Sequence, residues 1–139
     1  MSNDFVLDPR LQSDGVILMD LELSRLILVD NSYFPWLILV PRRENLKEII
    51  DLNQKERIVL MEEISLTSEV MQKIFCPDKL NIAALGNIVS QLHIHIVARF
   101  TNDKAYPHPV FGREKKPYEL EKQEELIKII SNALKNRIG

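Results

Sequence analysis

The chain has 139 residues, 45% hydrophobic and 27% charged, a composition that excludes a disordered protein and favours one globular domain over residues 1–139. The net charge of −2 at pH 7 weighs against a protein that binds nucleic-acid polymers, because such proteins usually present a basic surface. The single cysteine excludes an internal disulfide framework, and with no signal peptide or membrane-length apolar run evident we expect a cytoplasmic protein without membrane contact.

Three short apolar segments follow an N-terminal turn or helix within residues 5–12. The first two segments, 15–20 and 25–30, are separated by a polar stretch that is typical of a hairpin connection. The third segment, 36–40, ends at Pro41, which cannot donate a backbone hydrogen bond. The sequence therefore predicts a hairpin and a third strand in the first third of the chain.

The middle of the chain is predicted to be helical. Asn45 can cap a short helix that runs to Leu52, with Leu46, Ile49 and Ile50 facing inward. Asn53 can cap a longer helix that ends before Pro77. Apolar residues recur along it at helical spacing: Ile58, Met61, Ile64, Met71, Ile74 and Phe75.

The last part of the chain returns to strand patterns. Residues 80–85 and 89–100 are predicted strands on either side of a Gly86-Asn87 turn. A Pro-rich loop follows over 101–116, and its aromatic stretch, 106–111, can cover a pocket or contact a second subunit. A final helix is predicted over about 117–138. Strands grouped around helices indicate an α+β fold with an antiparallel sheet.

One predicted strand carries most of the chemically versatile side chains. Successive strand residues point to opposite faces, so Gln91, His93, His95 and Arg99 share one face while the other face is apolar. The two imidazoles would stand about 6–7 Å apart, close to a turn whose backbone N–H groups can bind an anion. Imidazole acts as nucleophile, base or acid near neutral pH, so this face is a candidate catalytic surface.

The residues alone leave two other interpretations of the histidine pair open. Alternating histidines on a half-buried strand can serve packing and surface hydrogen bonds only. A metal site is the other alternative, because histidines on one face can bind zinc, but it needs a further ligand. His108, the third histidine of the chain, and Asp103 lie on the Pro-rich loop at no diagnostic spacing. We therefore expect no metal ion and no cofactor.

The segment Gln91-Leu92-His93-Ile94-His95-Ile96-Val97 resembles the histidine triad (HIT) motif, in which three histidines alternate with apolar residues. Residues 81–90 are similar to the hairpin that precedes that motif, with its Gly-Gln-x-Val sequence, and residues 36–42 resemble the family's Gly-His-x-Leu-Val-x-Pro-Lys strand. The resemblance spans roughly residues 15–100 and is strongest to bacterial HIT-like proteins whose motif begins with Gln.

This resemblance implies a fold and an assembly. The expected fold is a HIT-like antiparallel sheet of about five strands, with its core at about 15–100. A long helix is expected between the third and fourth strands, and a second helix at the C-terminus. The family is typically a homodimer in which the sheets of the two subunits join, so a homodimer is expected here.

The resemblance also implies catalytic roles. His93 matches the family's nucleophile, which attacks the α-phosphorus of a nucleotide and becomes nucleotidylated. His95 matches the histidine that contacts phosphate and helps to orient the nucleophile. Gln91 stands in place of the first histidine; its amide can donate a hydrogen bond but cannot transfer a proton near neutral pH.

Further substrate contacts are expected from three other places in the chain. Asn87 matches a phosphate-binding Gln, and Asn81 matches a polar residue near the family's active site. Either Asp30 or Asn31 corresponds to the residue that binds ribose, and the resemblance does not choose between them.

Two more side chains can be assigned in two ways. Trp36 replaces a family histidine and can close the pocket or stack on a base, or simply pack in the core. Arg99 shares the histidine face and can approach a phosphate or pair with an acid at the sheet edge.

Together these features imply a nucleotide-type small-molecule substrate. The expected activity is that of a nucleotide hydrolase or nucleotidyl transferase that cleaves an α-phosphate linkage through a nucleotidyl-His93 intermediate. Its class would be that of a phosphoramidase or a diadenosine polyphosphate hydrolase. Because Gln91 and Trp36 replace two of the family's histidines, the alternative is a nucleotide-binding or regulatory protein on the same scaffold with weak or no catalysis.

Overall fold

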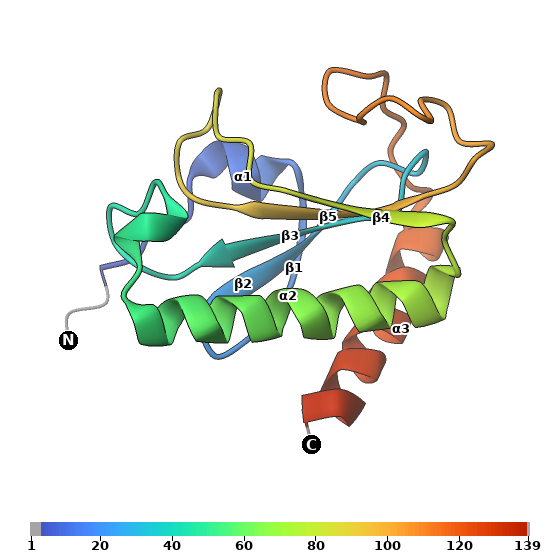
Figure 1. Ribbon diagram of the computed structural model, residues 1–139. Helices are drawn as coiled ribbons and strands as arrows, with labels where there is room; N and C mark the ends of the chain where they lie inside the picture. The colour runs from blue at the N-terminus through green and yellow to red at the C-terminus, as the bar shows by residue number, and fades with distance from the viewer. Residues whose placement is uncertain (1–3, 139) are drawn as a thin grey trace.

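The computed structural model describes residues 4–138 and contains a five-stranded antiparallel sheet with the strand order β1-β2-β3-β5-β4 (Figure 1). The strands are β1 (Gly15–Asp20), β2 (Ser24–Val29), β3 (Trp36–Pro41), β4 (Lys79–Ala83) and β5 (Ile94–Arg99). Every neighbouring pair is antiparallel. The predicted sheet of about five antiparallel strands is therefore confirmed.

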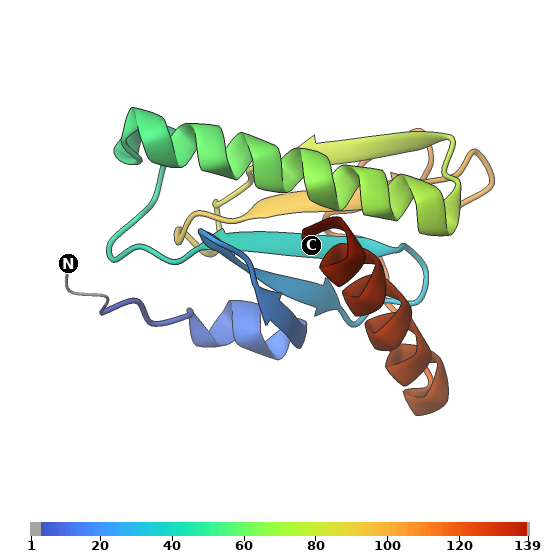
Figure 2. The same cartoon turned by 90° about the horizontal axis from the view of Figure 1, so that it is seen from below.

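Two long helices cover one face of this sheet. They are α2 (Gln54–Phe75), which connects β3 to β4, and α3 (Leu120–Ile138). Figure 2 shows both helices lying across the sheet. The largest core cluster lies in this layer and joins side chains such as Leu26, Leu37 and Ile96 of the sheet to Met71 and Ile130 of the helices. No described helix has the length and hydropathy that a membrane span requires.

The opposite face of the sheet is covered by chain segments that carry little regular structure. The short helix α1 (Pro9–Ser13) buries Leu11 against Ile27 and Ile38. The loop after β5 buries Ala105 and Val110 against Val97 of β5. All six residues of β5 are consequently buried, and the predicted histidine face is an interior surface rather than an open face of the sheet.

The predicted start of α2 is confirmed, whereas the prediction of a short helix before it is wrong. Asn53 caps α2 as expected, since its side chain accepts a hydrogen bond from the Glu56 N–H. Asn45 instead adopts a left-handed backbone conformation, with φ of 57°, which no helix N-cap uses. The only regular structure here is a single 3-10 turn, η1 (Ile49–Asp51). Leu46 is buried as predicted, but Ile50 is 82% exposed and Ile49 is also exposed, so neither isoleucine faces inward.

The last strand and the last helix both begin later than predicted, because backbone N–H groups near their predicted starts bind distant partners. The strand expected over 89–100 begins at Ile94, because the Leu92 N–H donates to the Leu46 carbonyl oxygen at 2.9 Å. The helix expected from about 117 begins at Leu120, and the Tyr118 N–H donates to Asp30. On α2, Ile64 and Met71 are buried as predicted. Ile58 and Met61 are instead 60% and 59% exposed, and Leu60 is the buried residue in the first half of the helix.

Candidate active site

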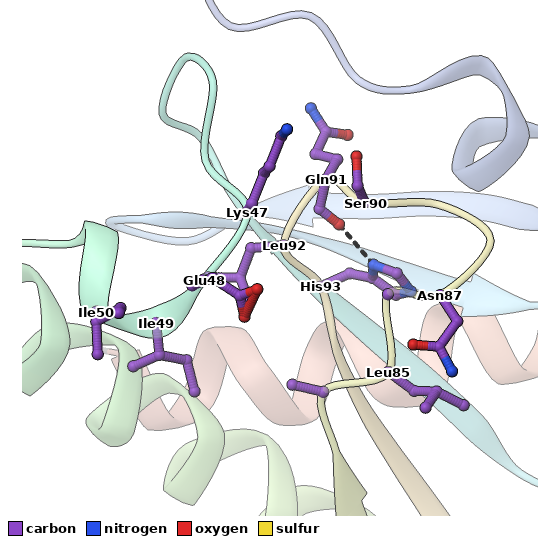
Figure 3. Close-up of a pocket in the computed structure, with 12 residues that line it drawn as sticks. Lys47, Glu48, Ile49, Ile50, Leu85, Asn87, Ser90, Gln91, Leu92 and His93 are labelled. Carbon is purple, nitrogen blue, oxygen red and sulfur yellow. Dashed lines mark hydrogen bonds between the residues drawn. The ribbon is translucent and has the colours of Figure 1, made fainter.

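His93 is held in one tautomer by its own backbone neighbourhood. It lies just before β5, it is only 5% exposed, and its Nδ1 atom lies 2.7 Å from the carbonyl oxygen of Gln91. A carbonyl oxygen can only accept a hydrogen bond, so Nδ1 carries the proton. The lone pair is then on Nε2, and Figure 3 shows this second ring nitrogen on the side of Asn87. The imidazole is thus prepared for nucleophilic attack through Nε2.

His95 is held in the opposite tautomer. The indole Nε1–H of Trp36, on β3, donates to His95 Nδ1 at 3.0 Å, so Nδ1 is the unprotonated nitrogen and Nε2 bears the hydrogen. The ring lies edge-on to those of His93, Trp36 and Phe111, with centroid distances of 4.7, 5.6 and 4.8 Å. Burial, together with the nearby His93, lowers the pKa of His95 to about 4. His95 is therefore a neutral hydrogen-bond donor near pH 7.

This pKa makes His95 a determinant of acid stability. A histidine with a pKa near 6.5 when unfolded and about 4 when folded binds its proton first in the unfolded state. Its full contribution to stability is present above pH 6.5 and is lost as the pH falls toward 4. We expect a loss of about 3 kcal/mol over this range. Urea unfolding at pH 7, 6, 5 and 4 measures it, and the His95→Gln variant should show a smaller decrease; an equal decrease in both proteins would contradict the assignment.

A cavity of about 440 Å³ opens beside His93. Its walls come from two loops, one after β3 and one between β4 and β5: Lys47, Glu48, Ile49, Ile50, Ala84, Leu85, Gly86, Asn87, Ser90, Gln91, Leu92 and His93. The structure thus brings His93 and Asn87 to one cavity, as expected. Lys47 and Glu48 were missed in the sequence, because nothing local links the loop after β3 to the histidines. Ser90, three residues before His93, was also missed. The combination of imidazole, amide, hydroxyl and ammonium groups suits a small anionic ligand.

Gln91 does not continue the row of imidazoles. It precedes β5, and its side-chain oxygen accepts a hydrogen bond from the Asp8 N–H at 2.8 Å, while its amide nitrogen donates to the Val6 carbonyl at 2.9 Å. Figure 3 shows the amide pointing away from the His93 ring. The predicted strand position is therefore wrong, and a direct contact of this amide with a substrate would require both bonds to break.

Arg99 and Asn81 are bound to each other rather than directed to the cavity. Arg99, 1% exposed, donates through Nη1 to the Asn81 side-chain oxygen at 2.8 Å and forms a two-point ion pair with Asp103 at 2.8 and 3.1 Å. Burial alone would raise the pKa of Asp103, but the Arg99 guanidinium and three backbone N–H groups hold it well below its usual range. Of the two alternatives for Arg99, the structure has the acid pair, which ties the loop after β5 to the sheet.

The side chains of Asp30 and Asn31 bind backbone N–H groups away from the cavity. Asp30 accepts from the Tyr118 N–H at 2.9 Å, and Asn31, which is buried, accepts from the Tyr33 N–H at 3.1 Å. Neither lines the cavity beside His93. Trp36 also lies outside that lining and reaches the site through His95. Within residues 4–138, no three His, Cys, Asp or Glu side chains are grouped to hold a metal ion.

Comparison with known proteins places this geometry in a family. The profile of the HIT domain matches residues 10–102. A histidine triad protein from Bradyrhizobium japonicum is 41% identical, with a TM-score of 0.91 over 94% of this chain and 98% of that one. A histidine triad protein from Marinobacter aquaeolei is 38% identical, with a TM-score of 0.92 over 95% and 97%.

A more distant structure shares the fold alone. Plasmodium falciparum diadenosine triphosphate hydrolase is 19% identical, with a TM-score of 0.63 over 99% of this chain and 84% of that one. A search of the curated proteins found no significant match. The domain profile and the two bacterial structures show that the chain belongs to the histidine triad (HIT) domain family.

Proposed function

We propose that this protein is a nucleotide hydrolase or nucleotidyl transferase that cleaves an α-phosphate linkage through a covalent intermediate on His93. One observation carries the proposal. The Gln91 carbonyl binds His93 Nδ1 at 2.7 Å, which leaves a nucleophilic Nε2 at the wall of a cavity of about 440 Å³. A buried imidazole with its lone pair directed in this way can attack phosphorus and divide one difficult step into two.

The reaction has two steps. In the first, the Nε2 lone pair of His93 forms a bond to the α-phosphorus, and the bond from phosphorus to the leaving group breaks with its electron pair on the leaving group. In the second, the oxygen of water or of another acceptor attacks phosphorus, the P–N bond returns its pair to Nε2, and the acceptor's proton passes to solvent. We assign the stabilisation of charge on the phosphoryl oxygens to the Nε2–H of His95, whose ring lies 4.7 Å from that of His93, and to the amide of Asn87 on the cavity wall. This scheme uses no metal ion.

The comparisons support the substrate class. HIT domains are related to nucleotide hydrolases and transferases, and the fold is shared with a diadenosine triphosphate hydrolase. The substrate we propose is accordingly a nucleoside phosphoramidate, a dinucleoside polyphosphate or a similar conjugate in which a nucleotide is joined through its α-phosphate.

A nucleotide panel tests this proposal. Purified protein is incubated with chelator and with adenosine phosphoramidate, diadenosine polyphosphates and nucleotide sugars, and product release is followed by chromatography. After rapid acid-free quenching, mass spectrometry should find one nucleotidyl group on the peptide that contains His93. Binding of a nucleotide without turnover would instead favour the alternative of a nucleotide-binding protein, which the occupied amide of Gln91 also suits. If the protein neither binds nor turns over any nucleotide in the panel, both functions are refuted.

We further propose that the protein is a homodimer joined along β4. This strand lies at the edge of the sheet, where an unpaired backbone is a template for another strand. Ile82 on β4 and Ile88 in the following loop are 49% and 85% exposed. A second subunit that pairs with β4 would cover these apolar side chains.

Light scattering tests this assembly. Wild-type protein should show twice the mass of one chain, and Ile82→Lys should shift it to the monomer, because a charge on an edge strand opposes strand pairing. Ile58→Lys changes another exposed isoleucine, on α2, and should leave the dimer intact. A monomeric wild-type protein would exclude the proposal.

A further inference from the structure

The row that carries three histidines in the family offers no mobile imidazole proton in this protein. At the first position the Gln91 amide cannot transfer a proton near neutral pH, and it is bound to Val6 and Asp8. At the second position the Nδ1 proton of His93 is held by the Gln91 carbonyl, and Nε2 is the nucleophile. Only the third position could still supply an acid.

Trp36 removes that last possibility. Its indole N–H can only donate, so the nitrogen that it contacts, His95 Nδ1, must remain unprotonated. To become an acid, His95 would need a proton on both nitrogens, and the bond to Trp36 would then be replaced by two opposed N–H groups. The ring is also enclosed by Phe111 and His93. Its low pKa, about 4, agrees with this geometry.

We propose that Trp36 is a positioning residue that confines His95 to the neutral Nε2–H tautomer, and that the site therefore cleaves phosphoanhydride linkages in preference to phosphoramidates. This inference rests on the proposed function and narrows its substrate class. Trp36 acts through His95 and has no place in the lining of the cavity.

The preference follows from the fate of the electron pair. When His93 Nε2 attacks an anhydride, the P–O bond breaks, and the pair stays on the oxygen of a phosphate or nucleotide, which is stable as an anion. When it attacks a phosphoramidate, the P–N bond breaks and the nitrogen must take a proton as it leaves, because an amide anion is too basic to depart. A positioned acid contributes about 10²–10⁴-fold to such a step, and that factor is absent here.

Three other titratable groups, Lys47, Glu48 and Asp8, lie near the cavity. Lys47 and Glu48 line it from the loop after β3 and have exposed side chains. The carboxylate of Asp8 is held by Arg10 at 2.9 Å. Lys47 is the one cationic donor on the cavity wall among the described residues, so the test includes Lys47→Met.

The first experiment compares leaving groups. Values of kcat/KM, which report the formation of the intermediate, are measured for diadenosine triphosphate, for adenosine phosphoramidate and for AMP esters of phenols of graded acidity. We expect the anhydride to exceed the phosphoramidate by about 10²-fold or more, with a steep decrease along the ester series as the phenol becomes less acidic. Lys47→Met should leave the ratio of the first two substrates unchanged.

The second experiment observes His95 without any substrate. Nitrogen-15 NMR of the wild-type protein should show Nδ1 unprotonated and Nε2 protonated from pH 5 to 8. Trp36→Phe keeps a ring against Phe111 but removes the donor, so both tautomers should appear, and the phosphoramidate-to-anhydride ratio should increase several-fold. A loss of packing alone would lower both rates together and leave their ratio unchanged.

The outcomes separate this inference from the proposed function. Turnover of both substrates at similar rates, or faster phosphoramidate cleavage, would overturn the inference while the nucleotidyl-His93 mechanism stands. A proton on Nδ1 of His95 in the wild-type protein at pH 7 would overturn it as well. No turnover of any substrate would refute the proposed function, and the narrower inference with it.

Discussion

Replacing His93 with alanine is expected to abolish nucleotide turnover, lowering kcat by at least about 10³-fold. In the proposed mechanism the Nε2 atom of His93 forms the bond to phosphorus, and no other imidazole can take over this role. His95 presents a protonated Nε2 and its Nδ1 is occupied by Trp36. The measurement is steady-state turnover of the best substrate from the panel, with quenched samples examined for a nucleotidylated peptide, which should be missing in the variant.

The matched control is His108→Ala. This histidine is exposed on the loop after β5 and takes no part in the site, so the variant should retain wild-type turnover. His93→Ala should still bind nucleotide in equilibrium dialysis, because the cavity wall is otherwise unchanged. Turnover by His93→Ala within tenfold of the wild-type value would show that the nucleophile is elsewhere.

Replacing Asp103 with alanine is expected to produce the largest loss of stability, about 3–5 kcal/mol. Its carboxylate and the Arg99 guanidinium are 4% and 1% exposed, so the change leaves a buried charge without its partner. It also leaves the backbone N–H groups of Phe100, Ala105 and Tyr106 without an acceptor. Urea unfolding at pH 7 measures the change in the free energy of unfolding.

Two comparisons make this prediction specific. Removing the exposed pair on α3 by Glu125→Ala should cost less than about 1 kcal/mol. In a double-mutant cycle, Arg99→Met combined with Asp103→Ala should be much less destabilised than the sum of the two single changes, because no charge is left buried. Additive effects would show that the two groups are not energetically coupled.

The same ion pair predicts a direction for acid stability. The pKa of Asp103 is lowered in the folded protein, so its contribution is fully present above its unfolded pKa of 3.8 and is lost as the pH falls below that value. The contribution of His95 to the free energy of unfolding is lost at higher pH, as the pH falls from about 6.5 to about 4. The two groups therefore act in separate pH ranges, and the difference between wild type and His95→Gln isolates the first.

The Asp103 network also links stability to the site. It secures the loop that carries Phe111, and Phe111 packs edge-on against His95 at 4.8 Å and against Trp36 at 5.7 Å. Weakening the network would open the aromatic enclosure of His95 to water. Arg99, which the sequence suggested as a phosphate contact, and Asn81, which it suggested near the active site, bind each other and so help to hold this loop against the sheet.

Much of the fold could be predicted because its determinants are local. Short apolar segments define the strands, the Asn53 capping interaction defines the start of α2, and scarce glycines and prolines mark the breaks. The predictions that were wrong concern segments in which local preference is overridden by a partner. Asn45 turns left-handed instead of capping a helix, and residues before Ile94 bind the N-terminal segment and Leu46 instead of extending β5.

The sequence by itself determined the fold class and the family resemblance, and it singled out His93, which lines the cavity and which we propose as the nucleophile. The tertiary structure alone decided the tautomers of His93 and His95, the tether of Gln91 and the buried pairing of Arg99. The physical reason is that a tautomer or a pKa depends on the group that contacts each nitrogen or oxygen. For His95 that group is Trp36, 59 positions away, and for Gln91 it is Asp8, 83 positions away. Only folding brings such pairs within hydrogen-bonding distance.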